Sequence, residues 1–251
     1  MLKKSIIIFS IIFSGVNIAN TPSKKQLLEQ VLSTICDSHN IPALSVAIID
    51  KGKPMYSAGF GYLYCSSQPV TEHTLFRIAS ITKLFTAQEI MQLVEQNKVK
   101  LDDDIAQYIN LFSGKNIKIV DLLTHTSGLT DVIKPVSFVN KHNFDTYLKQ
   151  SLALNNTAKN KSFNYADLNF NILGKIIEIV SGKTYNNYIH HHIFRKIGLT
   201  HSGFRLATNN LKPDVHPSYN YGFIFNAPIR PYDMNYLPSE GLISSVDELS
   251  K

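Results

Sequence analysis

The amino-acid sequence predicts an α/β fold in which a small antiparallel sheet accompanies a larger helical region. Three observations support this prediction. Residues 24–38 have the apolar spacing of a helix, residues 43–64 have the pattern of two strands joined by a turn, and helical patterns dominate after Thr74. With 251 residues, 44% of them hydrophobic and 18% charged, the chain has a globular composition and enough apolar material for a buried core.

The first helix and the hairpin follow from short local patterns. In residues 24–38 the apolar residues share one helical stripe, made of Leu27, Leu28, Val31, Leu32 and Ile35. The run 43–49 is rich in Val and Ile, Asp50-Lys51-Gly52 is a turn, and residues 54–64 form the returning strand. We therefore expect a helix followed by an antiparallel hairpin over 43–64.

The region after Thr74 is predicted to be mainly helical. One helix is apolar on more than one side and should be largely buried, because its apolar residues are Leu84, Phe85, Ile90, Met91, Leu93 and Val94. Another helix is expected to start at Leu101-Asp102-Asp103-Asp104, with the acidic residues in its first turn as partners of the helix dipole. A short helix is expected over 117–124.

The second half of the chain alternates helices with irregular segments. Residues 168–180 form a clear helix, since Ile172, Leu173, Ile176, Ile177 and Val180 share a face and Gly182 follows as a stop. Residues 184–195 are also expected to be helical. Residues 128–145 and the Pro-, Asn- and Tyr-rich segment 203–240 are expected to be irregular.

The first 19 residues have the features of a secretory signal peptide. Lys3 and Lys4 precede an apolar run over 6–13, and small or polar residues lead to an expected cleavage after Ala19. The run is shorter than the roughly 20 apolar residues of a transmembrane helix, and no other segment has the pattern of a stable membrane span. We expect a periplasmic or secreted protein, with an uncleaved N-terminal anchor as the alternative.

Charge and metal-binding patterns exclude some classes of partner. The net charge of +6 comes from 25 Lys and Arg against 19 Asp and Glu that are scattered along the chain, so no nucleic-acid partner is expected. Cys36 and Cys65 either form a disulfide or remain free thiols, and their spacing does not fit a metal site. In His190-His191-His192, successive helical side chains point about 100° apart and cannot converge on one ion. We expect no cofactor.

The candidate chemistry begins with the Ser-x-x-Lys pattern of Ser80 and Lys83. Positions i and i+3 share a helix face, so the Ser80 hydroxyl and the Lys83 amine can meet. A serine needs a base beside it to become a nucleophile, and a desolvated lysine can act as that base. Most such pairs are solvated surface, but this lysine lies in a markedly apolar helix, where an unpaired charge is costly.

A second candidate element is Tyr165-Ala166-Asp167, just before the helix at 168–180. Tyr165 could transfer a proton between the serine and a leaving group. Asp167 could orient a substrate amide or a lysine, or it could simply cap the helix, since Asp is a favoured N-cap residue. One residue could serve both purposes.

These segments, in this order, resemble the serine beta-lactamase and penicillin-binding hydrolase superfamily, in the branch of class C beta-lactamases, R61-type D-alanyl-D-alanine carboxypeptidases and related esterases. The resemblance extends from about residue 24 to the end. It is carried by four segments: Thr74 to Lys83, Leu122-Leu123-Thr124-His125-Thr126-Ser127-Gly128-Leu129, Tyr165-Ala166-Asp167 and Gly241-Leu242-Ile243-Ser244-Ser245. It implies a mostly antiparallel sheet flanked by helices, together with an all-α region.

The resemblance also implies a role for each site residue. Ser80 would be the acylated nucleophile, with its backbone N–H as one oxyanion donor. Lys83 would be its base, and Tyr165 would relay the proton to the leaving group and activate water for deacylation. Asp167 stands where the family usually has an Asn that contacts the substrate amide, and His125 would be a structural support.

The sequence departs from the family pattern at several positions. Glu240 replaces the first glycine of a Gly-Gly-Leu segment, Lys118 replaces a helix-capping threonine, and Lys196 replaces a proline. No Lys-Thr-Gly or His-x-Gly motif stands in a plausible place after residue 167. Ser245-Val246-Asp247-Glu248 has the pattern of a capping box, yet the sequence stops three residues later. We expect a C-terminal truncation in which the last strands of the sheet are missing.

The sequence therefore predicts a signal peptide over 1–19 and an incomplete hydrolase domain over 20–251. Residues 20–72 would belong to the α/β region and residues 73–251 to the mainly helical region. The expected function is an exported serine hydrolase that acts through an acyl-enzyme on a D-Ala-D-Ala peptide, a β-lactam or a small ester. The alternative is an inactive family member or fragment that at most binds wall peptides.

Overall fold

A computed structural model describes residues 22–63, 67–131, 144–154, 161–204, 215–216 and 236–251. The chain divides into two compact units between Ile41 and Pro42. Within the described ranges no helix is long and apolar enough to cross a membrane. The expected signal peptide and Cys65 lie outside the described residues.

The first unit contains the helix α1 (Lys24–Ser38), as the apolar spacing predicted. A capping box starts it, because the Ser23 hydroxyl accepts the Gln26 N–H at 3.2 Å and Gln26 Oε1 accepts the Ser23 N–H at 2.8 Å.

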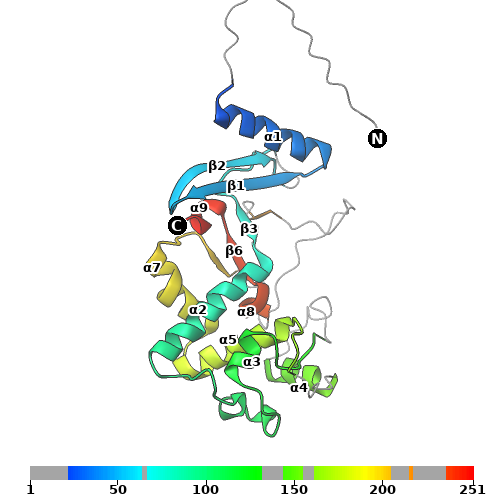
Figure 1. The fold of residues 1–251 in the computed structure, drawn as a ribbon, viewed down its shortest axis with the longest axis vertical. Coiled ribbons are helices and arrows are strands. Elements are labelled where there is room, and N and C mark those ends of the chain that lie inside the picture. The colour runs from blue at the N-terminus through cyan, green and yellow to red at the C-terminus, as the bar shows by residue number, and fades with distance from the viewer. Residues whose placement is uncertain (1–21, 64–66, 132–143, 155–160, 205–214, 217–235) are drawn as a thin grey trace, which may run out of the picture. The chain divides into compact units, whose positions relative to one another are not determined.

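The second unit begins with the predicted hairpin, which consists of the antiparallel strands β1 (Ala43–Asp50) and β2 (Lys53–Gly61) (Figure 1). Lys51 and Gly52 form the turn, and both have positive φ (49° and 74°). Two consecutive left-handed residues match the right-handed twist of a hairpin, and glycine adopts this conformation without steric cost. The strand register shifts between Ile48 and Ile49.

A second sheet has four very short strands in the order β4-β6-β3-β5. The strands are β3 (Leu75–Arg77), β4 (Gly203–Phe204), β5 (Val215–His216) and β6 (Leu242–Ser244). The β3–β6 and β4–β6 pairs are antiparallel, and the β3–β5 pair is parallel. The helical period predicted directly after Thr74 is therefore wrong for residues 75–77, because the chain first adds a strand to this sheet.

The helices of the second unit follow in chain order, with short 3-10 turns between them. They are α2 (Thr82–Glu95), α3 (Ile119–Leu123), α4 (Phe144–Leu154), α5 (Asp167–Ser181), α6 (Tyr185–Ile189), a π-helical turn (His190–Phe194), α7 (Arg195–Ile197), α8 (Leu237–Glu240) and α9 (Val246–Leu249). The predictions for 117–124, 168–180 and 184–195 are confirmed. The irregular structure expected over 128–145 and 203–240 is wrong where α4, α8, β4 and β5 occur.

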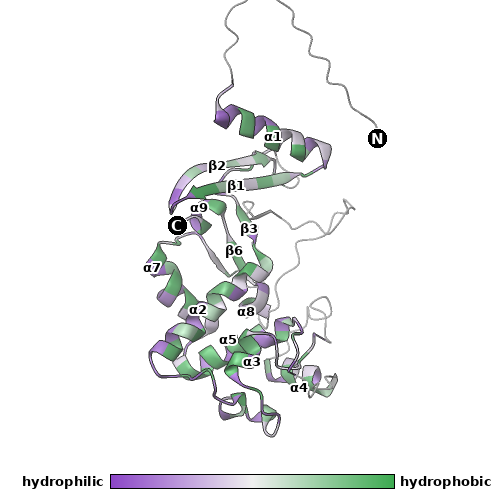
Figure 2. Ribbon diagram, in the orientation of Figure 1, coloured by the Kyte–Doolittle hydropathy of each residue, from purple (hydrophilic) through white to green (hydrophobic). Residues whose placement is uncertain are grey.

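The core is built around α5. Ile172, Leu173, Ile176 and Ile177 are fully buried, as the shared face predicted, and Val180 is partly buried. Figure 2 shows hydrophobic residues recurring along this helix between polar ones. Full burial of one such side chain contributes about 1.5–3 kcal/mol. Helix α5 packs against α2, α3, α6 and α8. It ends where predicted, at Gly182 with φ of 69°.

Helix α2 is less completely buried than predicted. Ile90 and Leu93 are fully buried, but Leu84 is 69% exposed and Met91 is 40% exposed. The buried stripe contains polar residues instead, namely Thr82, Lys83, Thr86 and Glu89. Helical spacing located the buried face only partly, because polar side chains on it bond to neighbouring elements. Lys83 bonds to α5 and α8, and Thr86 bonds to α6 and α8.

The helix expected to start at Leu101–Asp104 is also wrong. Only a 3-10 turn, Ile105–Gln107, forms there, and Asp104 caps it. Asp103 accepts hydrogen bonds from the Lys100 N–H (2.8 Å) and the Tyr108 hydroxyl (2.6 Å). These short local bonds compete with the helical ladder, as Asp side chains commonly do.

Candidate active site

Ser80 lies in a strained turn between β3 and α2. The 3-10 turn Ala79–Ile81 joins the two elements, and Ala79 has φ of 45°, which is unfavourable for a residue with a Cβ. The Ile78 N–H donates to the Leu242 carbonyl at 3.1 Å and so fixes the turn to β6. Ser80 itself is exposed. Strain of this kind persists only where the surrounding structure holds it, and it is frequent at functional sites.

Lys83 lies on the first turn of α2 and is buried, with 6% exposure. Its Nζ donates to Ser80 Oγ at 3.0 Å, to Asp167 Oδ1 at 2.5 Å and to the Ser239 carbonyl at 3.0 Å. An ammonium group has three protons, so every one of them has an acceptor. The i, i+3 spacing therefore does bring Ser80 and Lys83 together.

Asp167 begins α5 but does not cap it. Ala166 is the N-cap residue, and the Asp167 carboxylate points to Lys83. The expectation that Asp167 caps this helix is therefore wrong. The carboxylate of Asp131 does so instead, since it accepts the backbone N–H of Asp167 at 2.7 Å and of Leu168 at 2.9 Å. Asp131 frees Asp167 for the lysine, and no local pattern pointed to a residue 36 positions away.

Tyr165 lies at the edge of the same site. Its ring centroid is 4.9 Å from Lys83 Nζ, and its ring packs against that of His125 in a tilted arrangement, with 4.4 Å between ring centroids. Tyr165 is 49% exposed. Among the described residues its hydroxyl has no hydrogen-bond partner, so the structure places the Tyr165 ring near Lys83 but joins its hydroxyl neither to Ser80 nor to Lys83.

The segment around His125 supports Tyr165 and the start of α5. His125 Nδ1 accepts the Ala166 N–H at 3.3 Å and lies 3.1 Å from Asn169 Nδ2. Burial, reinforced by the charge of Lys83, lowers the pKa of His125, so the ring is neutral near pH 7. Ser127 Oγ donates to Asn169 Oδ1 at 2.6 Å. These are the contacts of a structural support.

Helix α8 completes the site from the other side. Thr86 Oγ1 donates to the Pro238 carbonyl at 2.7 Å, which fixes α8 to α2 and places Ser239 at Lys83. Gly174 of α5 allows this approach, because a Cβ there would come within 2.1 Å of Pro238. The next residue, Glu240, is half-buried. In the sequence it is a departure from the glycine of the family pattern, and that pattern alone does not place it at the site.

The segment after α8 contains a carboxylate with many donors. Ser245 caps α9 as predicted, by accepting the Glu248 N–H at 3.2 Å. Glu248 does not bond back to Ser245. It accepts the backbone N–H groups of Thr200, His201 and Ser202 at 2.9, 3.1 and 2.7 Å. The letters His-x-Gly do occur at 201–203, but Glu248 binds this turn, and Gly203 on β4 is separated from β3 by β6.

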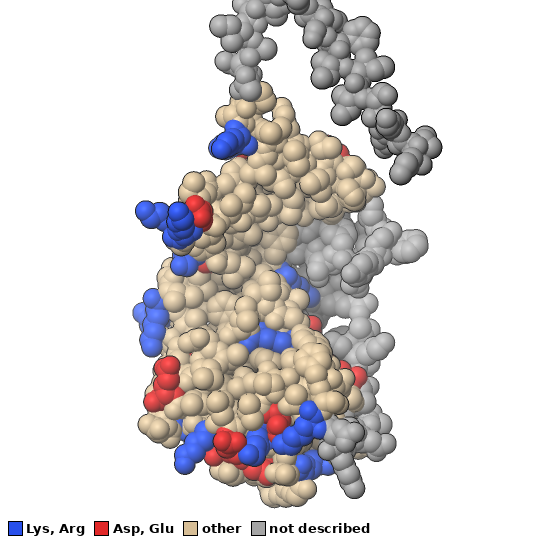
Figure 3. Space-filling view, viewed as in Figure 1, with Lys and Arg blue, Asp and Glu red and all other residues tan. Residues whose placement is uncertain are grey.

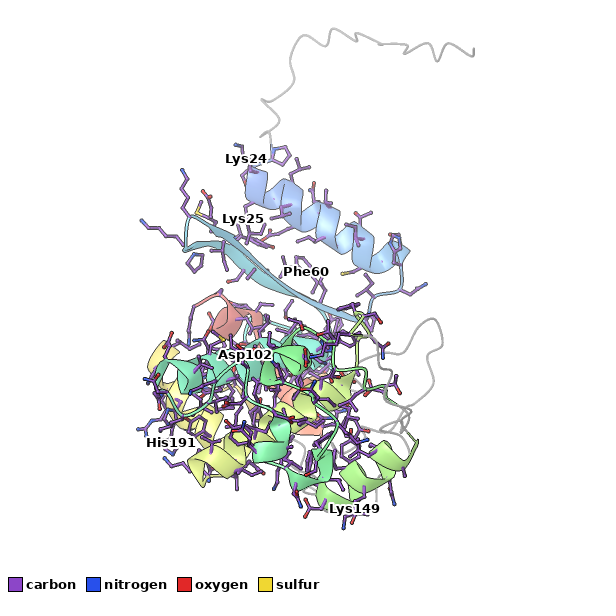
Figure 4. All side chains as sticks on the ribbon, turned by 60° about the horizontal axis from the view of Figure 1, so that its bottom comes forward. Lys24, Lys25, Phe60, Asp102, Lys149 and His191 are labelled. Atoms are coloured by element: carbon purple, nitrogen blue, oxygen red, sulfur yellow. The ribbon has the colours of Figure 1, made fainter. Side chains whose placement is uncertain are left out.

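Metal-binding geometry is absent from the part of the chain that the structure describes, where no group of three or more His, Cys, Asp or Glu side chains could hold an ion. His192 stacks on Tyr188 at 4.0 Å, whereas the rings of His190 and His191 are nearly perpendicular. Figure 4 shows His191 at the periphery of the helical region.

On the face shown in Figure 3, Lys and Arg side chains are dispersed among acidic ones.

Comparison with known proteins gives one family. The family described as Beta-lactamase matches residues 26–251. Protein flp of Staphylococcus aureus (strain N315) is 26% identical over 91% of this chain and 48% of its own length. Putative penicillin-binding protein PbpX of Bacillus subtilis (strain 168) is 30% identical over 80% of this chain and 51% of its own length. This chain spans about half the length of these curated relatives.

A similar fold occurs in a solved structure. The octameric penicillin-binding protein homologue from Pyrococcus abyssi superposes with a TM-score of 0.71 at 30% identity, over 91% of this chain and 55% of the other. The predicted fold class is thereby confirmed.

Proposed function

Because the chain belongs to the beta-lactamase family, we propose that it is an exported serine hydrolase that forms an acyl-enzyme at Ser80. One observation carries this proposal. An exposed serine on a strained turn is hydrogen-bonded at 3.0 Å to a buried lysine, whose other two protons are bound by Asp167 and Ser239. A nucleophile and base in contact, with the base oriented by further groups, is the arrangement that covalent catalysis requires.

In the proposed acylation step, Lys83 in its neutral form takes the proton of the Ser80 hydroxyl. Ser80 Oγ then bonds to the carbonyl carbon of an ester or amide, and the carbonyl oxygen becomes an oxyanion next to the Ser80 N–H. The carbon–leaving-group bond breaks, and Tyr165 gives its hydroxyl proton to the leaving group while it takes up the proton that Lys83 removed from Ser80. Asp167 holds Lys83 in position.

In the proposed deacylation step, a water molecule gives a proton to the neutral Lys83, directly or through Tyr165, and its oxygen bonds to the acyl carbon. The Ser80 ester bond breaks, and Ser80 Oγ takes that proton from Lys83, which releases the carboxylic acid and restores the free enzyme. The 49% exposure of Tyr165 supports this role, because water can reach this residue. The proposed substrates are a small ester, a D-Ala-D-Ala peptide or a β-lactam, and the name of the Bacillus subtilis relative supports the last of these, because penicillin is a β-lactam.

The proposal places the chain outside the cytoplasm. Residues 1–19 would direct export and residues 20–251 would form the hydrolase part. This assignment is supported by the charged and apolar pattern of the first 19 residues. N-terminal sequencing of the exported protein is expected to begin at residue 20.

The test is covalent labelling of the 251-residue chain. We expect a labelled penicillin or a neutral p-nitrophenyl ester to leave an acyl group on the peptide that contains Ser80, detected by intact-protein and peptide mass spectrometry. Ser80→Ala should abolish the adduct. Ser113→Ala is the matched control, because Ser113 is exposed and, in the part of the chain that the structure describes, its hydroxyl donates only to Asn110 Oδ1. If folded protein gives no adduct with either reagent, the proposal is wrong and binding alone would remain.

A further inference from the structure

The site contains more carboxylates than are needed to bind Lys83. Two departures from the family pattern, Asp167 in place of Asn and Glu240 in place of Gly, both put a carboxylate beside Lys83. Asp131 adds a third. Among the described residues, the positive side chains that act on Glu240 against these acids are Lys83 and Arg77.

The three carboxylates differ in their partners. Asp167 is bound to Lys83, and Asp131 accepts two backbone N–H groups. Within the described ranges the Glu240 carboxylate has no hydrogen bond and no ion pair, although it is half-buried. An ionised group held away from water without a partner is costly, so the Glu240 carboxylate, which lacks a donor among the described residues, can accept one from a bound molecule.

The position of Glu240 puts this acceptor within reach of the reacting atoms. It directly follows Ser239, whose carbonyl binds Lys83. Helix α8, which ends at Glu240, packs against the Ala79–Ile81 turn, α2 and α5, which carry Ser80, Lys83 and Asp167 respectively. Burial, and then the charge of Asp167, raise the pKa of Glu240. A cation bound beside it would relieve the repulsion.

We propose that Glu240 makes the site selective for acyl substrates that carry a positively charged group, such as an ammonium, over substrates that carry a carboxylate. This inference rests on the proposed function and narrows its substrate class toward cationic esters and amides. Glu240 is a specificity residue in this scheme, because its carboxylate contacts the charged group and not the reacting bond.

The experiment compares three p-nitrophenyl esters of similar length with the 251-residue chain. The acyl groups are 4-(trimethylammonio)butanoate, its neutral isostere 5,5-dimethylhexanoate, and glutarate with a free carboxylate. We expect kcat/KM for the cationic ester to exceed that of the neutral ester by about tenfold, and that of the glutarate ester to be lowest. In Glu240→Gln the cationic advantage should fall to about threefold or less.

Two controls separate this inference from the proposed function. Asp102→Asn removes a carboxylate that is 84% exposed and pairs with Lys118, so it should leave the ratio unchanged. If all three esters are hydrolysed through Ser80 without charge preference, the inference is wrong and the proposed function stands. If no ester reacts, the proposed function fails, and the inference about Glu240 is then tested by binding alone. Calorimetry with the corresponding unreactive amides and Ser80→Ala should then show tighter binding of the cationic amide, lost on Glu240→Gln. Equal binding would overturn the inference.

Discussion

The two halves of α2 each bury one ionisable side chain, and the two side chains differ in their hydrogen-bond partners. Lys83, near the N-terminus of the helix, has three acceptors at 2.5–3.0 Å. Glu89, two turns later, is fully buried, and within the described residues neither of its carboxylate oxygens has a hydrogen bond. Burial is nearly equal at the two positions, so the partners make the difference.

The pKa values show what the missing partners mean. Burial raises the pKa of Glu89 to about 7, and the charge of Lys196 opposes the shift only in part. Elsewhere in the unit, Glu248 is equally buried. Burial alone would raise its pKa, but hydrogen bonds from the Ser202 hydroxyl and from the backbone of Thr200, Ser202 and His201 lower it to about 2. Donors, and not depth, decide whether a buried carboxyl is charged.

Removing the hydrogen-bonded lysine near the start of α2 should have the largest effect. Lys83→Met removes the proposed base and should slow acylation by about a thousandfold, as loss of a general base commonly does. It also leaves Asp167 beside an apolar side chain, which should lower the free energy of unfolding at pH 7 by about 1–3 kcal/mol. Ester hydrolysis and urea unfolding measure the two effects.

The double variant separates the two effects. Adding Asp167→Asn to Lys83→Met should restore most of the lost stability but none of the activity, since the unpaired charge is gone and the base is still missing. The surface variant Lys118→Met is the control for stability, because its ion pair with Asp102 is screened by solvent and should contribute little. Acylation at the normal rate in Lys83→Met would contradict the assignment of the base.

Glu248→Gln should have the next largest effect, on stability alone. The folded pKa lies below the ordinary value of 4.5, so the carboxylate stabilises the fold above pH 4.5, and this contribution is lost as the pH falls towards 2. We expect Glu248→Gln to lower the free energy of unfolding by about 2–3 kcal/mol at pH 7. The difference between variant and parent should shrink at pH 3, and a constant difference over this range would contradict the role of the charge.

Glu89→Gln should have the smallest effect and the opposite sign. Its folded pKa is above 4.5, so ionisation of the unfolded chain begins to destabilise the fold above pH 4.5, and the loss is complete above about pH 7. We expect a gain of about 2 kcal/mol at pH 8, less than the full linkage value because the buried amide also lacks a partner. At pH 4 parent and variant should unfold alike in urea. A variant that is destabilised at pH 8 would show that Glu89 has a partner in solution.

Local patterns predicted the parts of this molecule that depend on neighbours in sequence. The hairpin, the buried face of α5 with its stop at Gly182, and the meeting of Ser80 with Lys83 all follow from spacings of two to four residues. The three-residue strands β3 and β6 have too few residues to show a period.

The remaining site groups come together only in the folded chain. Asp131 reaches the start of α5 from a segment before it, and Ser239 reaches Lys83 across 156 positions. The burial of Glu89 could not be predicted from its apolar neighbours, because a helix that is apolar on several sides has no single buried face to which a polar residue can be assigned. Spacing describes an element, whereas the partners of a buried charge depend on packing between elements.

The three acceptors around Lys83 also set a direction. When the ammonium loses a proton, two N–H bonds remain, and Asp167 Oδ1 and the Ser239 carbonyl oxygen can each accept only from such a bond. The fourth tetrahedral corner of the nitrogen, now a lone pair, is then left facing Ser80 Oγ. Two oxygens that take no part in bond making or breaking would thus aim the basic orbital at the proton that it must remove.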